Sequence, residues 1–216
     1  MDEYPYEDSG QLAEAIAGAG SSGVQEVLFI SSDTQTIIGF LDSISSLAEY
    51  DDKGLFMTDP AANPDVMTQS NAAALGKIRG TRPAPLDENE GVYASFIAAY
   101  AAEFREDVRS LPYTPNVFDA AWLLTYGAAW AALREDGITG RNMARGLRHV
   151  SGGQEVEIRP SGWTSVLQEF RDGHSIDVRG ASGELDFDPE TEETSASIEV
   201  WHVEDRSIVQ IYTVNP

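Results

Sequence analysis

The first 80 residues alternate between amphipathic helical patterns and short apolar runs, and this alternation restricts the possible folds more than any other feature of the sequence. Helical patterns are predicted at about 10–19, 34–48 and 63–75, and short apolar runs at 24–30, 55–57 and 77–80. The second half of VQEVLFI is apolar without alternation, which is typical of a strand covered on both faces. The order therefore predicts an α/β fold with a parallel sheet and helices on both faces.

Residues that start helices support the same division. Asp8 or Ser9, then Asp33 or Thr34, can accept from the free N–H groups of a first turn. Asn63 followed by Pro64 is a third such start. After the last apolar run, TRPAPLDEN has two prolines and no periodicity, so residues 81–90 are predicted to connect two parts of the molecule.

The second part begins with helices and ends in strands. Helical patterns occupy about 92–105, 114–133 and the residues after Thr139, with no strand pattern between them, and Ser161 can cap a short last helix. Residues 151–154 are interpreted as a loop. Strands are predicted at 184–187, 198–203 and 207–214, the last two as a C-terminal hairpin. The helices need a sheet to cover, so we expect that sheet to lie elsewhere or to be missing.

Composition narrows the function classes. The chain of 216 residues has a net charge of -22, and its only lysines are Lys53 and Lys77, which argues against nucleic acid and anionic membrane as partners. A salty environment or a secreted life would each account for the acidity. The absence of cysteine excludes disulfides, thiolate metal sites and cysteine nucleophiles. The N-terminus lacks the regions of a signal peptide, and no apolar run approaches the ~20 residues of a membrane span.

An ordered set of segments resembles the second half of a type I periplasmic binding protein, and more narrowly the branched-chain amino-acid binding proteins of ABC transporters. The segments are EVLFISSDT (26–34), GLFMTDPAAN (54–63), KIRGTRPA (77–84), YTPNVFDAAWLL (113–124), PSGW (160–163) and the closing GASGELDFD with IEVWHV. The resemblance covers about 10–211. It implies an incomplete fold of the periplasmic-binding-protein-like I class, because the first half of the family's chain has no counterpart here.

The resemblance also implies an organisation and a role. Residues 1–80 would be the later part of lobe II, 81–90 the inter-lobe connection, 91–178 the helices of lobe I, and 179–216 a hairpin that recrosses the hinge. The chain would be the C-terminal part of a non-enzymatic solute-binding protein for amino acids, serving an ABC permease. The complete protein would be periplasmic or an extracellular lipoprotein. A ligand-sensing receptor domain of the same fold is a close alternative.

Two loops are candidate ligand contacts because they follow predicted parallel strands, where open α/β sheets bind ligands. They are Ser31, Ser32, Asp33 and Thr34 after the first strand, and Asp59 after the second. Their carboxylates could pair with a ligand ammonium, and hydroxyl and N–H groups could take a carboxylate. Asp33 could equally serve only as a helix cap. By the resemblance, Phe118 approaches the rim of the same cleft, although a core position is the plainer interpretation.

Other chemistry receives less support. Ser32, Asp33 and Asp59 could host hydrolysis, but no histidine lies near them in sequence and no nucleophile motif is present. The acidic residues at 186–193 lack the spacing of a calcium loop, and the three histidines do not pair, so neither a metal nor a cofactor is expected. GAGSSG at 18–23 follows a helix and precedes a strand, the reverse of a dinucleotide cradle. The unmatched apolar faces of 92–133 predict self-association of the chain.

Overall fold

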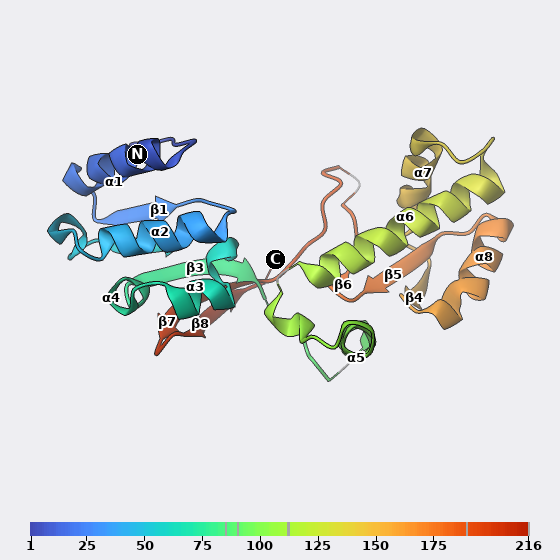
Figure 1. The fold of residues 1–216 in the computed structure, drawn as a ribbon. Helices are drawn as coiled ribbons and strands as arrows, with labels where there is room; N and C mark the ends of the chain where they lie inside the picture. The colour runs from blue at the N-terminus through green and yellow to red at the C-terminus, as the bar shows by residue number, and fades with distance from the viewer. Residues whose placement is uncertain (85, 90, 112, 189, 216) are drawn as a thin grey trace. The chain divides into compact units, whose positions relative to one another are not determined.

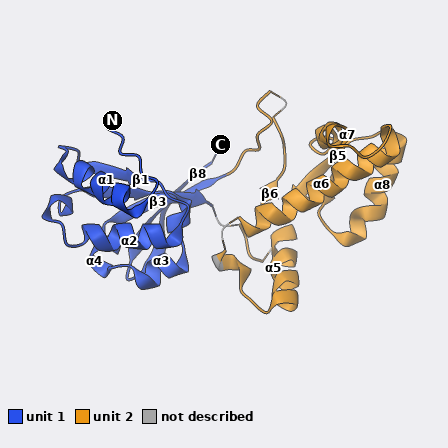
Figure 2. Ribbon diagram, turned by 45° about the horizontal axis from the view of Figure 1, so that its top comes forward, with its two compact units in different colours: residues 1–84, 197–215 blue, residues 85–196, 216 orange. Residues whose placement is uncertain are grey.

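A computed structural model describes residues 1–84, 86–89, 91–111, 113–188 and 190–215, and the chain divides into two compact units. Unit 1 combines Met1–Ala84 with Ser197–Asn215, and unit 2 is the segment between them, Pro85–Ala196. Figure 2 colours the units separately. Pro85 and Glu90 of the predicted connection, and Pro189 of the closing segment, lie outside the described residues.

Unit 1 is built on a five-stranded sheet in the order β1-β2-β3-β7-β8 (Figure 1). The first three strands are parallel, and β7 and β8 add to them as an antiparallel hairpin. The elements are α1 (Ser9–Ser21), β1 (Glu26–Phe29), α2 (Thr34–Ile44), η1 (Ala48–Tyr50), β2 (Gly54–Met57), η2 (Asp59–Ala61), α3 (Pro64–Gln69), α4 (Ala72–Leu75), β3 (Ile78–Pro83), β7 (Ile198–Glu204) and β8 (Ser207–Val214). The predicted parallel sheet and C-terminal hairpin are thus confirmed.

The predicted helix starts are present in unit 1. Asp8 accepts from Gly10 N and Gln11 N, and Asn63 accepts from Asp65 N with Pro64 at the first helical position. The helix expected over 63–75 is wrong as a single element. Ser70 is extended, with ψ of 159°, and Asn71 caps a second helix through Ala73 N. A new side-chain cap there offers the backbone an alternative to continuing the helix.

The helices of unit 1 pack on one face of its sheet, where the sequence predicts helices on both. Buried residues of all four helices share one core with the inward side chains of the strands. The strand members of that core are Phe29, Leu55, Met57, Ile78, Trp201 and Val203. On β1 the neighbouring Leu28 is 51% exposed. No described element covers that second face. α2 lies between β1 and β2, and α3 and α4 lie between β2 and β3, and these strands follow one another in the same direction across the sheet.

Unit 2 contains a three-stranded sheet, of which the sequence analysis predicted only a strand at 184–187 that overlaps the observed β6 at Glu184 (Figure 1). Its strands β4 and β5 are parallel, and β6 pairs antiparallel with β5. The elements are α5 (Gly91–Phe104), η3 (Val108–Ser110), α6 (Thr114–Arg134), α7 (Gly140–Gly146), η4 (Leu147–His149), β4 (Gln154–Glu157), η5 (Pro160–Gly162), α8 (Trp163–Asp172), β5 (Ile176–Gly180) and β6 (Gly183–Glu184). The N-cap of α8 is Gly162 and not Ser161, since one 3-10 turn precedes the helix.

This sheet gives the helices of unit 2 a surface to cover. Val156, Ile176 and Val178 are buried in one core with residues of α5, α6 and α8. The helix layer therefore has part of its sheet within the chain, supplied by segments after the helices. The predicted closing segment is divided: Gly183–Glu184 belongs to unit 2, whereas β7 and β8 complete the sheet of unit 1. The assignment of these units to lobes stays a prediction.

Candidate functional site

The predicted polar loops lie at one edge of the unit 1 sheet. β1 and β2 are parallel, with Phe29 opposite Met57, so the residues that follow them leave the sheet on the same side. Ser31 to Thr34 follow β1 and lead into α2, and Asp59 opens η2 after β2. The structure therefore brings five of the six predicted site residues together at this edge.

Asp33 caps α2, which is one of the two roles that the sequence suggested for it. Its Oδ1 accepts from Thr36 N at 2.8 Å and from Thr36 Oγ1 at 2.7 Å. The hydroxyl and the backbone N–H of Thr36 hold the pKa of the Asp33 carboxyl below its usual value. Both of these bonds fall on Oδ1 of an exposed side chain, and a carboxylate has lone pairs enough to accept from a cation as well. Capping and ligand contact are compatible here.

Asp59 makes fewer local hydrogen bonds than Asp33. Its carbonyl oxygen accepts from Ala62 N at 2.9 Å, while its neighbour Asn63 supplies the side-chain cap of α3. The Asp59 side chain is half-buried beside the end of β2. Ser31 Oγ accepts from Asp33 N at 3.2 Å, which orders the loop between β1 and α2. The edge thus combines two carboxylates, three hydroxyl-bearing residues and the N-terminus of an eleven-residue helix.

Phe118 lies in unit 2, on the first turns of α6, whereas the other five residues belong to unit 1. Its ring is 5.0 Å from the Phe96 ring and 6.4 Å from the Trp122 ring. It packs against the core of unit 2 and is half-buried. These contacts are those of a core aromatic, and a ligand contact by Phe118 stays a prediction.

Asp119, the next residue on α6, is a buried carboxylate that the sequence analysis missed. Its Oδ1 accepts from Ala181 N at 2.8 Å, and its Oδ2 accepts from Ser182 N at 2.6 Å and from Ser182 Oγ at 2.5 Å. Burial raises the pKa of Asp119, and these hydrogen bonds oppose the rise. Burial raises the pKa of Tyr126 to about 12, and the charge of Asp119 contributes to this rise. Its position three residues before Trp122, on the buried stripe, was the available signal.

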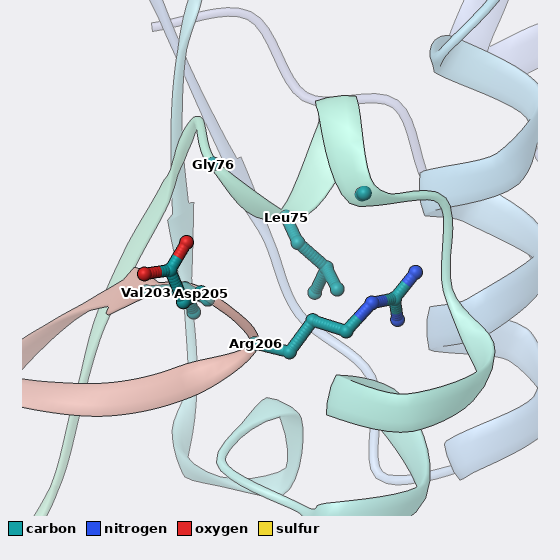
Figure 3. Close-up of a pocket in the computed structure, with 6 residues that line it drawn as sticks. Leu75, Gly76, Val203, Asp205 and Arg206 are labelled. Atoms are coloured by element: carbon teal, nitrogen blue, oxygen red, sulfur yellow. The ribbon is translucent and has the colours of Figure 1, made fainter.

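One surface pocket of unit 1 lies away from the predicted edge. A volume of about 470 Å³ is bounded by Ala72, Leu75, Gly76, Val203, Asp205 and Arg206 (Figure 3). Gly76 precedes β3 and Val203 lies near the end of the antiparallel β7, so the pocket lies at the opposite end of the sheet. The Arg206 guanidinium already donates to the carbonyl oxygens of Met67 and Thr68. This pocket is distinct from the predicted site.

The described residues contain neither a cluster of metal ligands nor a membrane-spanning helix. No set of three or more His, Asp or Glu side chains in these residues could hold a metal ion. Within the same ranges, no helix is long and apolar enough to cross a bilayer. The GAGSSG segment was predicted to be a loop, which is wrong for most of it: Gly18 to Ser21 form the last turn of α1, and only Ser22 and Gly23 lie in the connection to β1.

Solved structures share this architecture. A leucine-binding protein, LivK, from Thermotoga maritima is 16% identical, with a TM-score of 0.60 over 96% of this chain and 48% of its own. LivJ from Streptococcus pneumoniae, in complex with isoleucine, is 12% identical, with a TM-score of 0.56 over 94% and 48%. A solute-binding protein of an ABC transporter from R. palustris, in complex with benzoate, is 13% identical, with a TM-score of 0.50 over 96% and 47%.

These likenesses decide the fold. The chain has the fold of part of a type I periplasmic binding protein. Its neighbours are solute-binding proteins and not enzymes. The chain spans about half the length of the solved structures that it matches. No protein-family model and no curated protein matches the sequence of this chain.

Proposed function

We propose that the chain is part of a solute-binding protein of an ABC-type uptake system and that its ligands are amino acids. The observation that carries the proposal is the polar edge of unit 1, where Ser31 to Thr34 and Asp59 follow adjacent parallel strands. In open α/β sheets this is where ligands bind. The Asp59 carboxylate would pair with the ligand ammonium, and the N-terminus of α2 would receive the ligand carboxylate.

We further propose that residues 1–216 supply one half of the binding protein, with β1 to β3 in the lobe II wall of the cleft. The half-length match to the solved structures supports this division. The complete protein would then be periplasmic or an extracellular lipoprotein and would deliver its ligand to a permease. Ligand capture would follow the hinge closure of two-lobed proteins, in which each lobe contributes contacts.

Titration calorimetry tests the ligand class. L-leucine and L-isoleucine should release or absorb heat on binding, whereas benzoate, the ligand of one neighbour, should not. Asp59→Asn keeps the shape of the side chain but removes its charge, so it should weaken amino-acid binding by about tenfold or more. Asp52→Asn is the matched control, because Asp52 is an exposed carboxylate before β2, at the other end of the strand.

The same titrations should be made on a longer chain that carries the other half of the fold. Binding by the longer chain alone supports the proposal that residues 1–216 are one wall of the site. If neither protein binds an amino acid, or if Asp59→Asn and Asp52→Asn weaken binding equally, the proposed site is wrong.

A further inference from the structure

Arg82 and Glu199 form an ion pair between adjacent strands of unit 1, and neither was a predicted site residue. Arg82 lies on β3 opposite Glu199 on β7. Arg82 Nε donates to Glu199 Oε1 at 3.0 Å, and Arg82 Nη2 lies 2.8 Å from the same oxygen. The Glu199 side chain is 1% exposed and that of Arg82 is 27% exposed. The guanidinium is therefore the part of the pair that a ligand can reach.

The ion pair orients the guanidinium and uses only one of its two edges. Glu199 occupies the edge formed by Nε and Nη2. The other edge, formed by Nη1 and the second N–H of Nη2, has no partner among the described residues. A planar guanidinium binds a carboxylate best through two parallel N–H groups. Arg82 thus retains a complete edge for a second carboxylate.

Arg82 lies at the same edge of the sheet as the predicted ligand loops. β2 and β3 are parallel with Met57 opposite Gly80, and Arg82 is two residues beyond Gly80. Asp59 is two residues beyond Met57, and η2, which Asp59 opens, contacts β3. Neighbouring strands are about 4.8 Å apart. Since a single carbon atom separates the ammonium and carboxylate of an α-amino acid, one such ligand fits between Asp59 and Arg82.

The N-terminus of α2 is the other group at this edge that suits a carboxylate. Each of the two groups already holds one carboxylate, that of Asp33 at the helix and that of Glu199 at Arg82. They differ in burial, because Asp33 is exposed whereas the Arg82 side chain is only 27% exposed. A hydrogen bond between charged groups is stronger where water is excluded. A ligand carboxylate therefore gains more from Arg82 than from the helix.

A purely structural role accounts less well for the ion pair. β3 and β7 are already joined by five residue pairs, from Arg79 opposite His202 to Pro83 opposite Ile198. A buried ion pair contributes little more than two apolar side chains would, because desolvation of both charges offsets their attraction. The strands do not need this pair to stay together, and its place at the ligand edge favours a role in binding.

We infer that Arg82 receives the carboxylate of the ligand whose ammonium pairs with Asp59, and that Glu199 is the positioning residue that orients Arg82. The inference rests on the proposed function and names the ligand group that decides specificity. The ligands are then α-amino acids with a free carboxylate. Amino-acid amides keep the ammonium but lack that carboxylate, so the site rejects them.

Titration calorimetry with L-leucine and L-leucinamide, on residues 1–216 and on the longer chain, tests the inference. At about pH 6 the amine of leucinamide stays protonated, so the two ligands differ only in the carboxylate. The parent protein should bind leucine about 100-fold more tightly than leucinamide. Arg82→Gln combined with Glu199→Gln removes both charges, so no buried charge is left unpaired. This double variant should weaken leucine binding by about 100-fold and leucinamide binding by less than about threefold.

Two further variants complete the design. Glu199→Gln alone keeps the guanidinium but loosens its orientation, so it should weaken leucine binding by about tenfold. The matched control is Glu26→Gln with Arg79→Gln, which neutralises another ion pair that includes a β3 arginine. The Arg79 side chain lies on the other face of the sheet, opposite Phe56, so the control should leave both affinities unchanged.

The outcomes separate the inference from the function on which it rests. If Asp59→Asn weakens leucine binding and the Arg82 and Glu199 double variant does not, the proposed function stands and the inference is wrong. An equal loss of leucine and leucinamide binding in the double variant means that the ion pair only supports the fold, which also overturns the inference. If the parent protein binds neither ligand, the proposed function and the inference fail together.

Discussion

At the scale of single residues, Asp119 is the group on which the fold of unit 2 depends most directly. It joins α6 to the turn between β5 and β6 by three hydrogen bonds from Ala181 and Ser182. Gly180 lies so close that a Cβ atom there would collide with the carboxylate. The charge is buried, and its value to the fold comes from donors that would otherwise remain unpaired.

Asp119→Ala should therefore lower the free energy of unfolding by about 3 kcal/mol, since it leaves buried N–H groups without acceptors. Ser182→Ala removes one donor and should cost about 1 kcal/mol. Burial raises the Asp119 pKa above the ordinary 3.8, so its contribution is largest below that value and falls as pH rises through the folded pKa. Urea unfolding at several pH values checks both effects. Equal stability of Asp119→Ala and the parent chain would contradict the argument.

At the scale of elements, close packing at the centre of the unit 1 sheet depends on Gly80. A Cβ atom there would lie 2.5 Å from the Met57 carbonyl oxygen and 2.6 Å from Cζ2 of Trp201, which is fully buried. Gly80→Ala should destabilise the protein by about 2–3 kcal/mol. Gly39→Ala, inside α2 with open space around it, should instead stabilise by about 0.5–1 kcal/mol. Thermal melts of the two variants should shift in opposite directions. A shift of the same sign in both would contradict this account.

The same scale shows what the sequence could predict. The boundaries of β8 and the cap at Asn63 follow from local patterns, because alternation and side-chain caps act within a few residues. β4 and β5 were not predicted because their sequences, QEVE and IDVRG, are short and about half charged. Such a composition is equally compatible with a solvated turn. Only pairing with each other shows that Val156 and Val178 share a face.

The candidate site divides in the same way. Parallel neighbours put Ser31 to Thr34 and Asp59 at one edge, and the α/β order alone predicted this arrangement. The hydrogen bond from Ser182 N to Asp119 joins residues that are 63 apart in sequence, so it depends on tertiary packing. Local patterns carry no information on such a contact, so the Asp119 contact could not be predicted.

At the scale of the whole molecule, the chain builds two separate cores. One core contains residues from α1 to β3 together with Trp201 and Val203, and the other lies entirely between Val92 and Leu185. Unit 1 thus includes β7 and β8, which follow unit 2 in the sequence. Cores that share no buried residue need not unfold together, and two-state behaviour then fails.

Substitutions in one core should therefore act on one unit. Gly80→Ala should speed amide exchange in β1, β2, β3 and β7, and Asp119→Ala in α6, β4 and β5, each leaving the other set unchanged. Hydrogen-exchange mass spectrometry resolves both sets in one measurement. Gly39→Ala serves as the control, since it should slow exchange in unit 1 only. If either destabilising variant accelerates exchange equally in both units, the two cores unfold as one cooperative body, and the division of the molecule into independent halves is wrong.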